Sequence, residues 1–470
     1  MATLDLSTQQ REELWQMLTV QLESHYQESR GMKVAPDLDL KAIKDLVRKF
    51  SVTQSNDPKQ AIQHVIDGLK EFTVHTTHPG YYGLFNPRSN FAGIAADLIT
   101  AVFNPQMAAW SHAPFSAEVE HFLVEEVGKN LGLAEVDGVF ASGGAEANST
   151  AVLCALNDQF EHFTDRGLLG LKEPPVLYTS IESHHSITRA ARNAGLGDRS
   201  VRLIEVDGKL RMDAQVLKQT IEADLDLGMK PFMLAATAGT TGSGAIDDLV
   251  KLGDIARQFD MWFHVDAAYG GALMAEDQLM RHLKGIQQAD SITFDVHKWF
   301  SVPMAASMFI SSNTAILEKA FRMTNPYMPK EARDLEIVDP FNHSIQWSRR
   351  FIGLKFYMTL LIYGWQGIRE TVLNQIKIGD LLRKYLIECR WQIENETVMP
   401  IICFRKQDLT NGQVQEICDA VVKSGKVWIS TYPIKGQLCL RACITNYLTE
   451  ENDLKVLIDV LEEAYQKTIK

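Results

Sequence analysis

Apolar positions along the chain follow two different periods, and the change between them divides the sequence. Residues 8–30, 38–50 and 57–72 carry apolar side chains at helical spacing, so residues 1–77 are predicted to form an N-terminal helical segment. From residue 78 onward, short apolar runs alternate with helical stretches. The runs expected to be strands are Gly138–Phe140, Val176–Tyr178, Val201–Glu205, Phe232–Ala236, Trp262–Val265, Ser291–Phe294 and Ala306–Ile310.

Most of these runs are continuously apolar, which is typical of strands that helices cover on both faces. Alternating strands and helices predict a large α/β domain with a mostly parallel seven-stranded sheet over residues 78–350. Two helices, Phe351–Tyr363 and Gln366–Glu388, should follow, and strand signals at Pro400–Phe404 and Gln437–Ile444 flank another helix. With a last helix at Glu451–Lys467, residues 351–470 are predicted to form a small α+β domain.

Composition excludes several classes of protein. The formal charge of −12 argues against a nucleic-acid binder and against attraction to an anionic membrane surface. The first 22 residues do not resemble a signal peptide, and no apolar stretch approaches the roughly 20 residues of a membrane span. The six cysteines form no C-x-x-C pair and no zinc-ligand pattern, so no metal is expected. These features favour a cytoplasmic protein.

Ligands of parallel sheets lie beyond the carboxyl ends of the strands, so the residues after each run are the candidates for chemistry. After the first run, two glycines, Gly143 and Gly144, precede a helix. Such a turn favours a bound phosphate, although a tight turn without ligand has the same pattern. After the second run stand His184 and His185, which could stack on a flat heterocycle or be ordinary loop histidines.

The later strand ends carry a hydroxyl-rich loop, an aspartate and a lysine. Thr241 belongs to the loop, which could hydrogen-bond a cofactor or be only a loop. Asp266 ends an apolar strand, where a buried carboxylate needs a partner such as a protonated ring nitrogen, or caps the next helix. Lys298 follows a buried strand between His297 and Trp299, a context that fits a solvated surface lysine poorly. A desolvated amine can form a Schiff base.

Each feature is modest alone, but their order is informative. A phosphate loop, a stacking histidine, a partner for a ring nitrogen and a Schiff-base lysine are the groups that pyridoxal phosphate requires. The sequence therefore predicts a pyridoxal-phosphate enzyme.

The surrounding motifs resemble those of the group II pyridoxal-phosphate-dependent amino-acid decarboxylases, which include the aromatic amino acid, glutamate, cysteine sulfinate and diaminobutyrate decarboxylases. The resemblance covers roughly residues 75 to 460. It rests on Asp266-Ala-Ala-Tyr269, His297-Lys298-Trp299, His78-Pro-Gly-Tyr-Tyr82, Trp110-Ser-His-Ala-Pro114, Ser348-Arg-Arg-Phe-Ile-Gly-Leu-Lys355 and Leu440-Arg-Ala-Cys-Ile-Thr-Asn446. It implies the aspartate aminotransferase fold (fold type I) and a homodimer with active sites at the subunit interface.

The resemblance also implies roles for individual residues. Lys298 would form the internal aldimine with pyridoxal phosphate, Asp266 would bond the pyridine nitrogen, and His184 would stack on the ring. The other residues expected to contact the cofactor are Gly144, Ala145 and His297 at the phosphate, with Thr241 and Ala268 nearby. The residues expected to contact the substrate are Tyr81, Leu84 and Phe85, which would form an apolar wall, and Arg441, which could meet a carboxylate or be structural.

The implied reaction is decarboxylation of an L-amino acid through a quinonoid intermediate. One departure concerns the loop tyrosine that protonates Cα in the family, because Phe341 stands at the expected place and Tyr327 lies earlier in the same region. Relatives with phenylalanine there can release an aldehyde. A decarboxylating aldehyde synthase, a lyase or an aminotransferase is therefore the alternative, and a non-catalytic binding protein is disfavoured by the intact Lys298 and Asp266.

Overall fold

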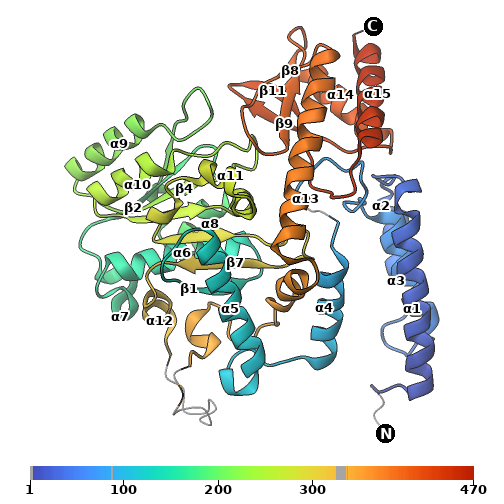
Figure 1. Ribbon diagram of the computed structural model, residues 1–470, viewed down its shortest axis with the longest axis horizontal. Coiled ribbons are helices and arrows are strands. Elements are labelled where there is room, and N and C mark those ends of the chain that lie inside the picture. Colours follow the sequence, from blue (N-terminus) through green and yellow to red (C-terminus); the bar gives the residue numbers. More distant parts are fainter. Residues whose placement is uncertain (1–3, 86–87, 324–334, 336, 470) are drawn as a thin grey trace. The chain divides into compact units, whose positions relative to one another are not determined.

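The computed structural model describes residues 4–85, 88–323, 335 and 337–469 (Figure 1). Contacts between residues divide the chain into two compact units. Unit 1 comprises residues 1–84, 405–442 and 448–470, and unit 2 comprises residues 85–404 and 443–447. The three-part division at residues 77 and 350 stays a prediction. Tyr327 lies outside the described residues.

Unit 2 is built on the predicted seven-stranded sheet, in the order β1-β7-β6-β5-β4-β2-β3. Every predicted apolar run overlaps one of its strands, and only Glu205 and Ala306 of the predicted runs lie one residue outside. The bounds are β1 (Asp137–Ala141), β2 (Pro175–Ser180), β3 (Val201–Ile204), β4 (Lys230–Thr237), β5 (Trp262–Asp266), β6 (Ser291–Phe294) and β7 (Ser307–Ser311).

Strand direction brings the candidate residues to one edge of this sheet. Strands β2 to β6 run parallel, and only β7 runs antiparallel to its neighbours β6 and β1. Strands β1, β2, β4, β5 and β6 therefore all end at the same edge. The α/β fold and the mostly parallel sheet are confirmed.

Helices cover both faces of the sheet (Figure 1). On one face, α6 (Gly144–Gln159), α8 (Ser186–Asn193) and α12 (Ile316–Phe321) share a buried apolar cluster with the strands. On the other face, α5 (Pro114–Asn130), α9 (Ala214–Asp226) and α10 (Leu249–Gln258) belong to a second cluster. Burial on both faces explains why the strands are continuously apolar.

Unit 2 also contains a long helix, α13 (Leu354–Glu388), which is interrupted at Gly364, where φ is 62°. The interruption separates the two helices that the sequence predicts. The remaining elements of this part of the chain are α4 (Phe91–Phe103), α7 (Phe163–Arg166), α11 (Asp277–Met280), β8 (Gln392–Ile393) and β9 (Ile401–Arg405). Its short 3-10 helices are η2 (Trp110–His112), η3 (Gly167–Gly170), η4 (Asp198–Ser200), η5 (Gly270–Ala275), η6 (Arg281–Leu283), η7 (Ile286–Gln288) and η8 (Pro340–His343).

Unit 1 contains the predicted N-terminal helices and the last helices of the chain. Ser7 caps the first helix in a capping box with Gln10, and Asp39 and Asp57 cap the next two. The helices are α1 (Thr8–Glu28), η1 (Ser29–Gly31), α2 (Leu40–Val47), α3 (Pro58–Phe72), α14 (Asn411–Lys423) and α15 (Glu451–Thr468). Strands β10 (Ser430–Ile434) and β11 (Gln437–Cys443) pair antiparallel as a hairpin. No helix in the described part of the chain could cross a membrane.

Candidate active site

Lys298 lies just beyond β6, in the segment that leads to β7. Its Nζ is 2.9 Å from Oδ2 of Asp295, a carboxylate that is almost fully buried. The Lys298 side chain is 21% exposed, so its amine can be reached from outside the core. The same nitrogen lies 5.6 Å from the ring centroid of Phe85. The predicted Schiff-base lysine is therefore held by a carboxylate and faces an aromatic side chain.

Asp266, the last residue of β5, lies in the core of unit 2 and accepts hydrogen bonds on both of its oxygens. The backbone N–H of Ala268 donates to Oδ1 at 3.1 Å, and Nδ2 of Asn148 donates to Oδ2 at 2.9 Å. Asn148 belongs to α6, which packs against the strands of the sheet. Helix α6 thus contributes directly to the position of the carboxylate.

A polar network continues behind Asn148 through strands β5 and β6. Oδ1 of Asn148 accepts from Oγ1 of Thr293 at 2.7 Å and lies 3.0 Å from Nε2 of His264. Nδ1 of His264 lies 2.8 Å from Oγ of Ser291, which accepts from the indole N–H of Trp262 at 2.8 Å. Complete burial lowers the pKa of His264 to about 4, so this histidine is neutral near pH 7.

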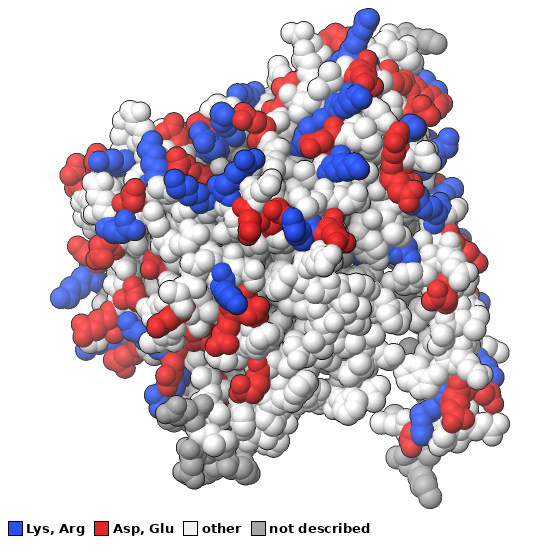
Figure 2. Space-filling model, in the orientation of Figure 1, with Lys and Arg blue, Asp and Glu red and all other residues white. Residues whose placement is uncertain are grey.

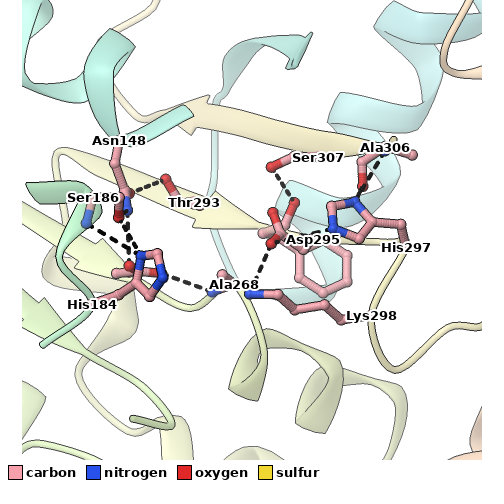
Figure 3. Close-up of polar contacts among 12 residues, drawn as sticks. Asn148, His184, Ser186, Ala268, Thr293, Asp295, His297, Lys298, Ala306 and Ser307 are labelled. Carbon is pink, nitrogen blue, oxygen red and sulfur yellow. Dashed lines mark hydrogen bonds and ion pairs between the residues drawn. The ribbon is translucent and has the colours of Figure 1, made fainter. Parts of the chain in front are cut away.

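His184 lies at the end of the loop after β2 and is joined to the same network. Its Nδ1 is 2.8 Å from Oγ of Ser186, and Nδ2 of Asn148 donates to that oxygen at 2.8 Å (Figure 3). Burial lowers the pKa of His184, the nearby charge of Asp266 has a smaller opposing effect, and the charge of Lys298 lowers the pKa further. The ring is therefore neutral near pH 7.

The predicted phosphate loop joins β1 to α6. The N–H groups of Gly144 and Ala145 stand at the start of this helix, where backbone donors have no acceptor within the helix. A Cβ on Gly144 would lie 3.0 Å from Oδ2 of Asp295, so a side chain there would require Asp295 to shift. His297 lies close to the loop, because a Cβ on Gly143 would come within 3.9 Å of its ring. Burial lowers the pKa of His297.

Two further predicted residues lie in unit 2. Ala268 follows β5 and contributes its N–H to Asp266. Thr241 is half-buried in the loop after β4, the strand beside β5. Both lie beyond the carboxyl ends of their strands, as expected.

The four predicted substrate residues fall in different units. Phe85, in unit 2, stacks on Tyr269 with ring centroids 4.0 Å apart, and Tyr269 stacks on Trp299 at 4.7 Å. Tyr81, Leu84 and Arg441 belong to unit 1. There the buried Arg441 donates to the carbonyl of Gly83 at 2.9 Å, and the hydroxyl of Tyr81 accepts from the N–H of Leu84 at 3.0 Å. Their contribution to substrate binding stays a prediction.

Sequence reasoning overlooked the residues that position the predicted ones. These are Asn148, Ser186, His264, Thr293 and Asp295. A signal was present, because His264 and Thr293 are polar residues inside otherwise apolar strands, and such residues need hydrogen-bond partners. Asn148 gave no comparable signal, since a polar residue in a helix is ordinarily exposed.

The residues at this edge fit pyridoxal phosphate. A reachable amine, a buried carboxylate, a neutral histidine and a helix start with available N–H groups all lie in the core of unit 2. Gly144 leaves space at the helix start that a side chain would fill. Among the described residues, no group of three or more His, Cys, Asp or Glu side chains could hold a metal ion.

Comparison with known proteins agrees with this geometry. The family described as "Pyridoxal-dependent decarboxylase conserved domain" matches residues 41–407, which is most of the chain. The chain belongs to this family. It is a pyridoxal-phosphate-dependent amino-acid decarboxylase, a carboxy-lyase, as the motifs predicted.

Several characterised relatives are similar over most of their length. An aromatic-L-amino-acid decarboxylase of Bacillus atrophaeus is 26% identical, covering 99% of this chain and 98% of its own. A phenylacetaldehyde synthase of Arabidopsis thaliana is 27% identical over 89% of each chain. A solved structure described as Oryza sativa TDC with PLP and tryptamine has the same fold, with a TM-score of 0.94, 22% identity and full coverage of both chains.

Proposed function

We propose that Lys298 is the residue that bonds pyridoxal phosphate and that Asp266 is the counter-ion of its ring nitrogen. The observation that carries this proposal is the position of the two side chains at the carboxyl ends of adjacent strands: Lys298 lies beyond the end of β6, and Asp266 is the last residue of β5. His184 is then the residue that stacks on the ring. The N–H groups of Gly144 and Ala145, with His297, are the phosphate site.

The bound cofactor supplies a ring that takes up the electron pair left at Cα when carbon dioxide departs. The protein keeps that ring electron-poor, because the carboxylate of Asp266 favours a proton on the ring nitrogen. Two N–H donors hold this carboxylate in place, so it does not need to reorganise during the reaction. The start of α6 favours the negative charge of the phosphate.

Lys298 also has a part in proton transfer. An amine must lose its ammonium proton before it can react with an aldehyde, and Asp295 is placed to hold that proton. Whenever the amine of Lys298 is not bonded to the cofactor, it would lie within reach of Asp295, as it does in this structure. The pair can therefore store a proton close to the reacting atoms.

We propose a substrate with an apolar or aromatic side chain. Phe85 faces the amine of Lys298 and begins a stack of three aromatic rings with Tyr269 and Trp299. Relatives include decarboxylases of aromatic amino acids, but also an acidic amino acid decarboxylase of Mus musculus. Arg441 is the residue that would serve an acidic substrate, and its guanidinium already donates to the carbonyl of Gly83.

Phe341 favours a second product, an aldehyde. It stands in η8, buried against Trp347 with ring centroids 4.7 Å apart. The sequence motifs lead us to expect the family's proton-donating tyrosine at this position. A phenyl ring has no proton to give to Cα. The alternative reaction consumes dioxygen: amino acid, O2 and water give the aldehyde, CO2, ammonia and hydrogen peroxide. The phenylacetaldehyde synthase among the relatives is similar over 89% of this chain.

We also propose that the enzyme is a homodimer, and that it is cytoplasmic. The supporting observation is an apolar surface of unit 2 over α4, which is almost free of charged side chains in Figure 2. Apolar surfaces of this kind commonly mark interfaces between proteins. Large apolar side chains are exposed on α4, α5 and the first part of α13, namely Phe91, Val102, Phe103, Phe115, Leu361 and Ile362.

The test combines product analysis with labelling. The purified enzyme with pyridoxal phosphate is incubated with a panel of L-amino acids, and CO2, amine, aldehyde and peroxide are assayed separately. Borohydride reduction followed by peptide mapping should find the pyridoxyl label on Lys298. A label on another lysine, or protein that stays colourless with the cofactor, would contradict the proposed site. Light scattering during size-exclusion chromatography tests the dimer.

Phe341→Tyr tests the product separately. If the phenylalanine causes aldehyde release, the tyrosine variant should form more amine and less peroxide per CO2. Phe163→Tyr, a change of the same kind in helix α7, is the control and should leave the ratio unchanged. An unchanged ratio of amine to peroxide in Phe341→Tyr would show that Phe341 does not decide which product forms.

A further inference from the structure

Asn148 occupies a position that the assigned roles leave unexplained. Its side-chain amide makes four hydrogen bonds, which is its full capacity, and two of the partners are Asp266 and Ser186. The other two partners are Thr293 and His264. One neutral side chain therefore connects the carboxylate proposed for the ring nitrogen with the serine that contacts His184.

The directions of the hydrogen bonds in this network follow from its two ends, of which one can only donate and the other can only accept. The indole N–H of Trp262 can only donate, and it donates to Oγ of Ser291. The hydroxyl of Ser291 is then free to give its own hydrogen to Nδ1 of His264, which lies 2.8 Å away. A neutral His264 whose Nδ1 accepts carries its proton on Nε2. That N–H faces Asn148.

The carboxylate of Asp266 settles which end of the Asn148 amide is the oxygen, because a carboxylate only accepts and therefore faces the NH2 group. The end that faces His264 and Thr293 receives two donors, so it is the carbonyl oxygen. The opposite end is the NH2 group, which donates to Oδ2 of Asp266 and to Oγ of Ser186. Ser186 therefore keeps its hydrogen for Nδ1 of His184.

Two consequences reach the candidate active site. Asp266 is held as a hydrogen-bond acceptor by two N–H groups, which leaves its remaining lone pairs for a protonated ring nitrogen. His184 accepts on Nδ1 from Ser186, through both the hydroxyl at 2.8 Å and the backbone N–H at 3.3 Å. Its proton is therefore on Nε2.

We propose that Asn148 is a positioning residue of this enzyme, which orients the carboxylate of Asp266 and, through Ser186, holds the proton of His184 on Nε2. The inference rests on the proposed roles of Asp266 and His184 in the site. Asn148 itself need not touch the cofactor or the substrate. Asn148 accepts from a buried network that includes His264, 116 residues away in the sequence, and donates toward the site. It thereby fixes the direction of the hydrogen bonds at the site.

Asn148→Asp tests the polarity with almost no change of shape. The new carboxylate keeps the acceptor for Thr293 and His264 but replaces the NH2 donor by an oxygen that repels Asp266. Ser186 would then donate its hydrogen to the new carboxylate and release Nδ1 of His184. We expect the Kd for pyridoxal phosphate to rise at least about tenfold, because a buried acceptor loses its donor. The pH at which the visible band of the bound cofactor changes should also shift.

Asn157→Asp is the matched control. Asn157 lies on the same helix, is equally buried, and bonds only the carbonyl of Leu153 and the hydroxyl of Thr164. A purely structural role for Asn148 would give both variants lower melting temperatures with an unchanged spectrum and cofactor Kd. That result overturns the proposal. If the aspartate variant does not fold, Asn148→Ala is measured in the same assays, because it removes the donor without adding a charge.

Ser186→Ala separates the two halves of the proposal. It removes the donor to His184 but leaves the bond from Asn148 to Asp266 intact. The cofactor Kd should stay within about twofold of the wild type, and kcat/KM should fall about tenfold. An unchanged kcat/KM overturns the part that concerns His184. Borohydride labelling of Lys298 distinguishes failure of this inference from failure of the proposed function. If Lys298 is labelled and the Asn148→Asp variant binds the cofactor as the wild type does, only this inference is rejected.

Discussion

Two carboxylates follow neighbouring strands of the sheet, and the protein holds them in opposite ways. Asp266 at the end of β5 accepts from two neutral N–H groups. Asp295 after β6 pairs with the ammonium of Lys298, and its Oδ1 is buried without a hydrogen-bond partner. The first carboxylate is held by a network that has no reason to change during the reaction, whereas the second pairs with the group that must react.

The difference shows how one edge of a sheet can supply both a fixed charge and an exchangeable one. A charge that stabilises an electron-poor ring acts best when its donors are already in place. A lysine that must be released needs a partner that can exchange a proton with it. The buried oxygen of Asp295 without a partner is therefore expected at the reactive pair and not at Asp266.

The largest expected effect comes from removing each charge in turn. Asp266→Asn should lower kcat/KM about 10²- to 10³-fold, because the ring nitrogen loses its counter-ion while the shape is kept. Asp295→Asn should change kcat/KM by less than about tenfold, since Lys298 remains able to react. Initial rates of CO2 release measure both. Equal losses in the two variants would show that the two carboxylates do not have different roles.

The next effect concerns the network behind Asp266 and depends on pH. Burial lowers the pKa of His264 to about 4, from an ordinary value of 6.5. A neutral buried histidine stabilises the fold above pH 6.5, and this stabilisation is lost as the pH falls toward 4, because the unfolded chain binds the proton first. The full loss is about 3 kcal/mol. Denaturant unfolding of the wild type and of His264→Gln, as a function of pH, measures it.

The comparison with His264→Gln is necessary because two aspartates titrate in the same range with the opposite sign. Burial raises the pKa of Asp247 and of Asp290 to about 6. Their contribution to stability is present below their ordinary pKa and is lost as the pH rises through about 6. Subtracting the free energy of unfolding of the variant from that of the wild type cancels the contribution of the two aspartates. A difference that does not depend on pH would mean that His264 does not titrate as proposed.

A smaller effect is expected at the ion pair of Lys298 and Asp295. The carboxylate of Asp295 forms an ion pair with Lys298 at 2.9 Å, and this pair must break before the lysine can bond the cofactor as an amine. Asp295→Asn should therefore tighten cofactor binding about tenfold near neutral pH, which corresponds to about 1.4 kcal/mol. Absorbance titration with pyridoxal phosphate measures the Kd. Asp290→Asn, at the opposite end of β6, is the control, and weaker binding in Asp295→Asn would contradict the exchange role.

The smallest effect is expected from one outer donor of the network. Thr293→Val removes one of the two donors to Oδ1 of Asn148 and keeps the shape, while His264 still donates. The free energy of unfolding should fall by about 1 kcal/mol, and the cofactor Kd should rise less than about threefold. Thr359→Val, which also loses a buried hydroxyl, should lower stability equally without any change in Kd. A Kd change as large as that of Asn148→Asp would make Thr293 more important than proposed.

Much of the fold could be predicted because buried parallel strands leave a strong pattern. Val176–Tyr178 and Ser291–Phe294 are uninterrupted apolar or hydroxyl-bearing runs, and both lie in central strands. The break at Gly364 was also foreseen as the boundary of two helices. Strand β10 was not foreseen, because Ser430–Ile434 is only partly buried and contains Pro433, so its pattern is weak.

The candidate site also contains residues that could be predicted from the sequence and residues that could not. Lys298, Asp266 and His184 could be named because each follows a recognisable strand, and parallel strands bring their carboxyl ends to one edge. Asn148 could not, since its importance comes from contacts with Asp266 and His264, which are 118 and 116 residues away. No local pattern records such contacts.

The sequence by itself determined the class of fold, the candidate residues that follow each strand, and the family. It could do so because burial and chemistry leave local patterns of residue type. Only the tertiary structure decided which carboxylate is held by neutral donors and which by Lys298. It also decided the proton positions on His264 and His184, because hydrogen-bond direction depends on partners that meet only when β5, β6, α6 and the loop before α8 pack together.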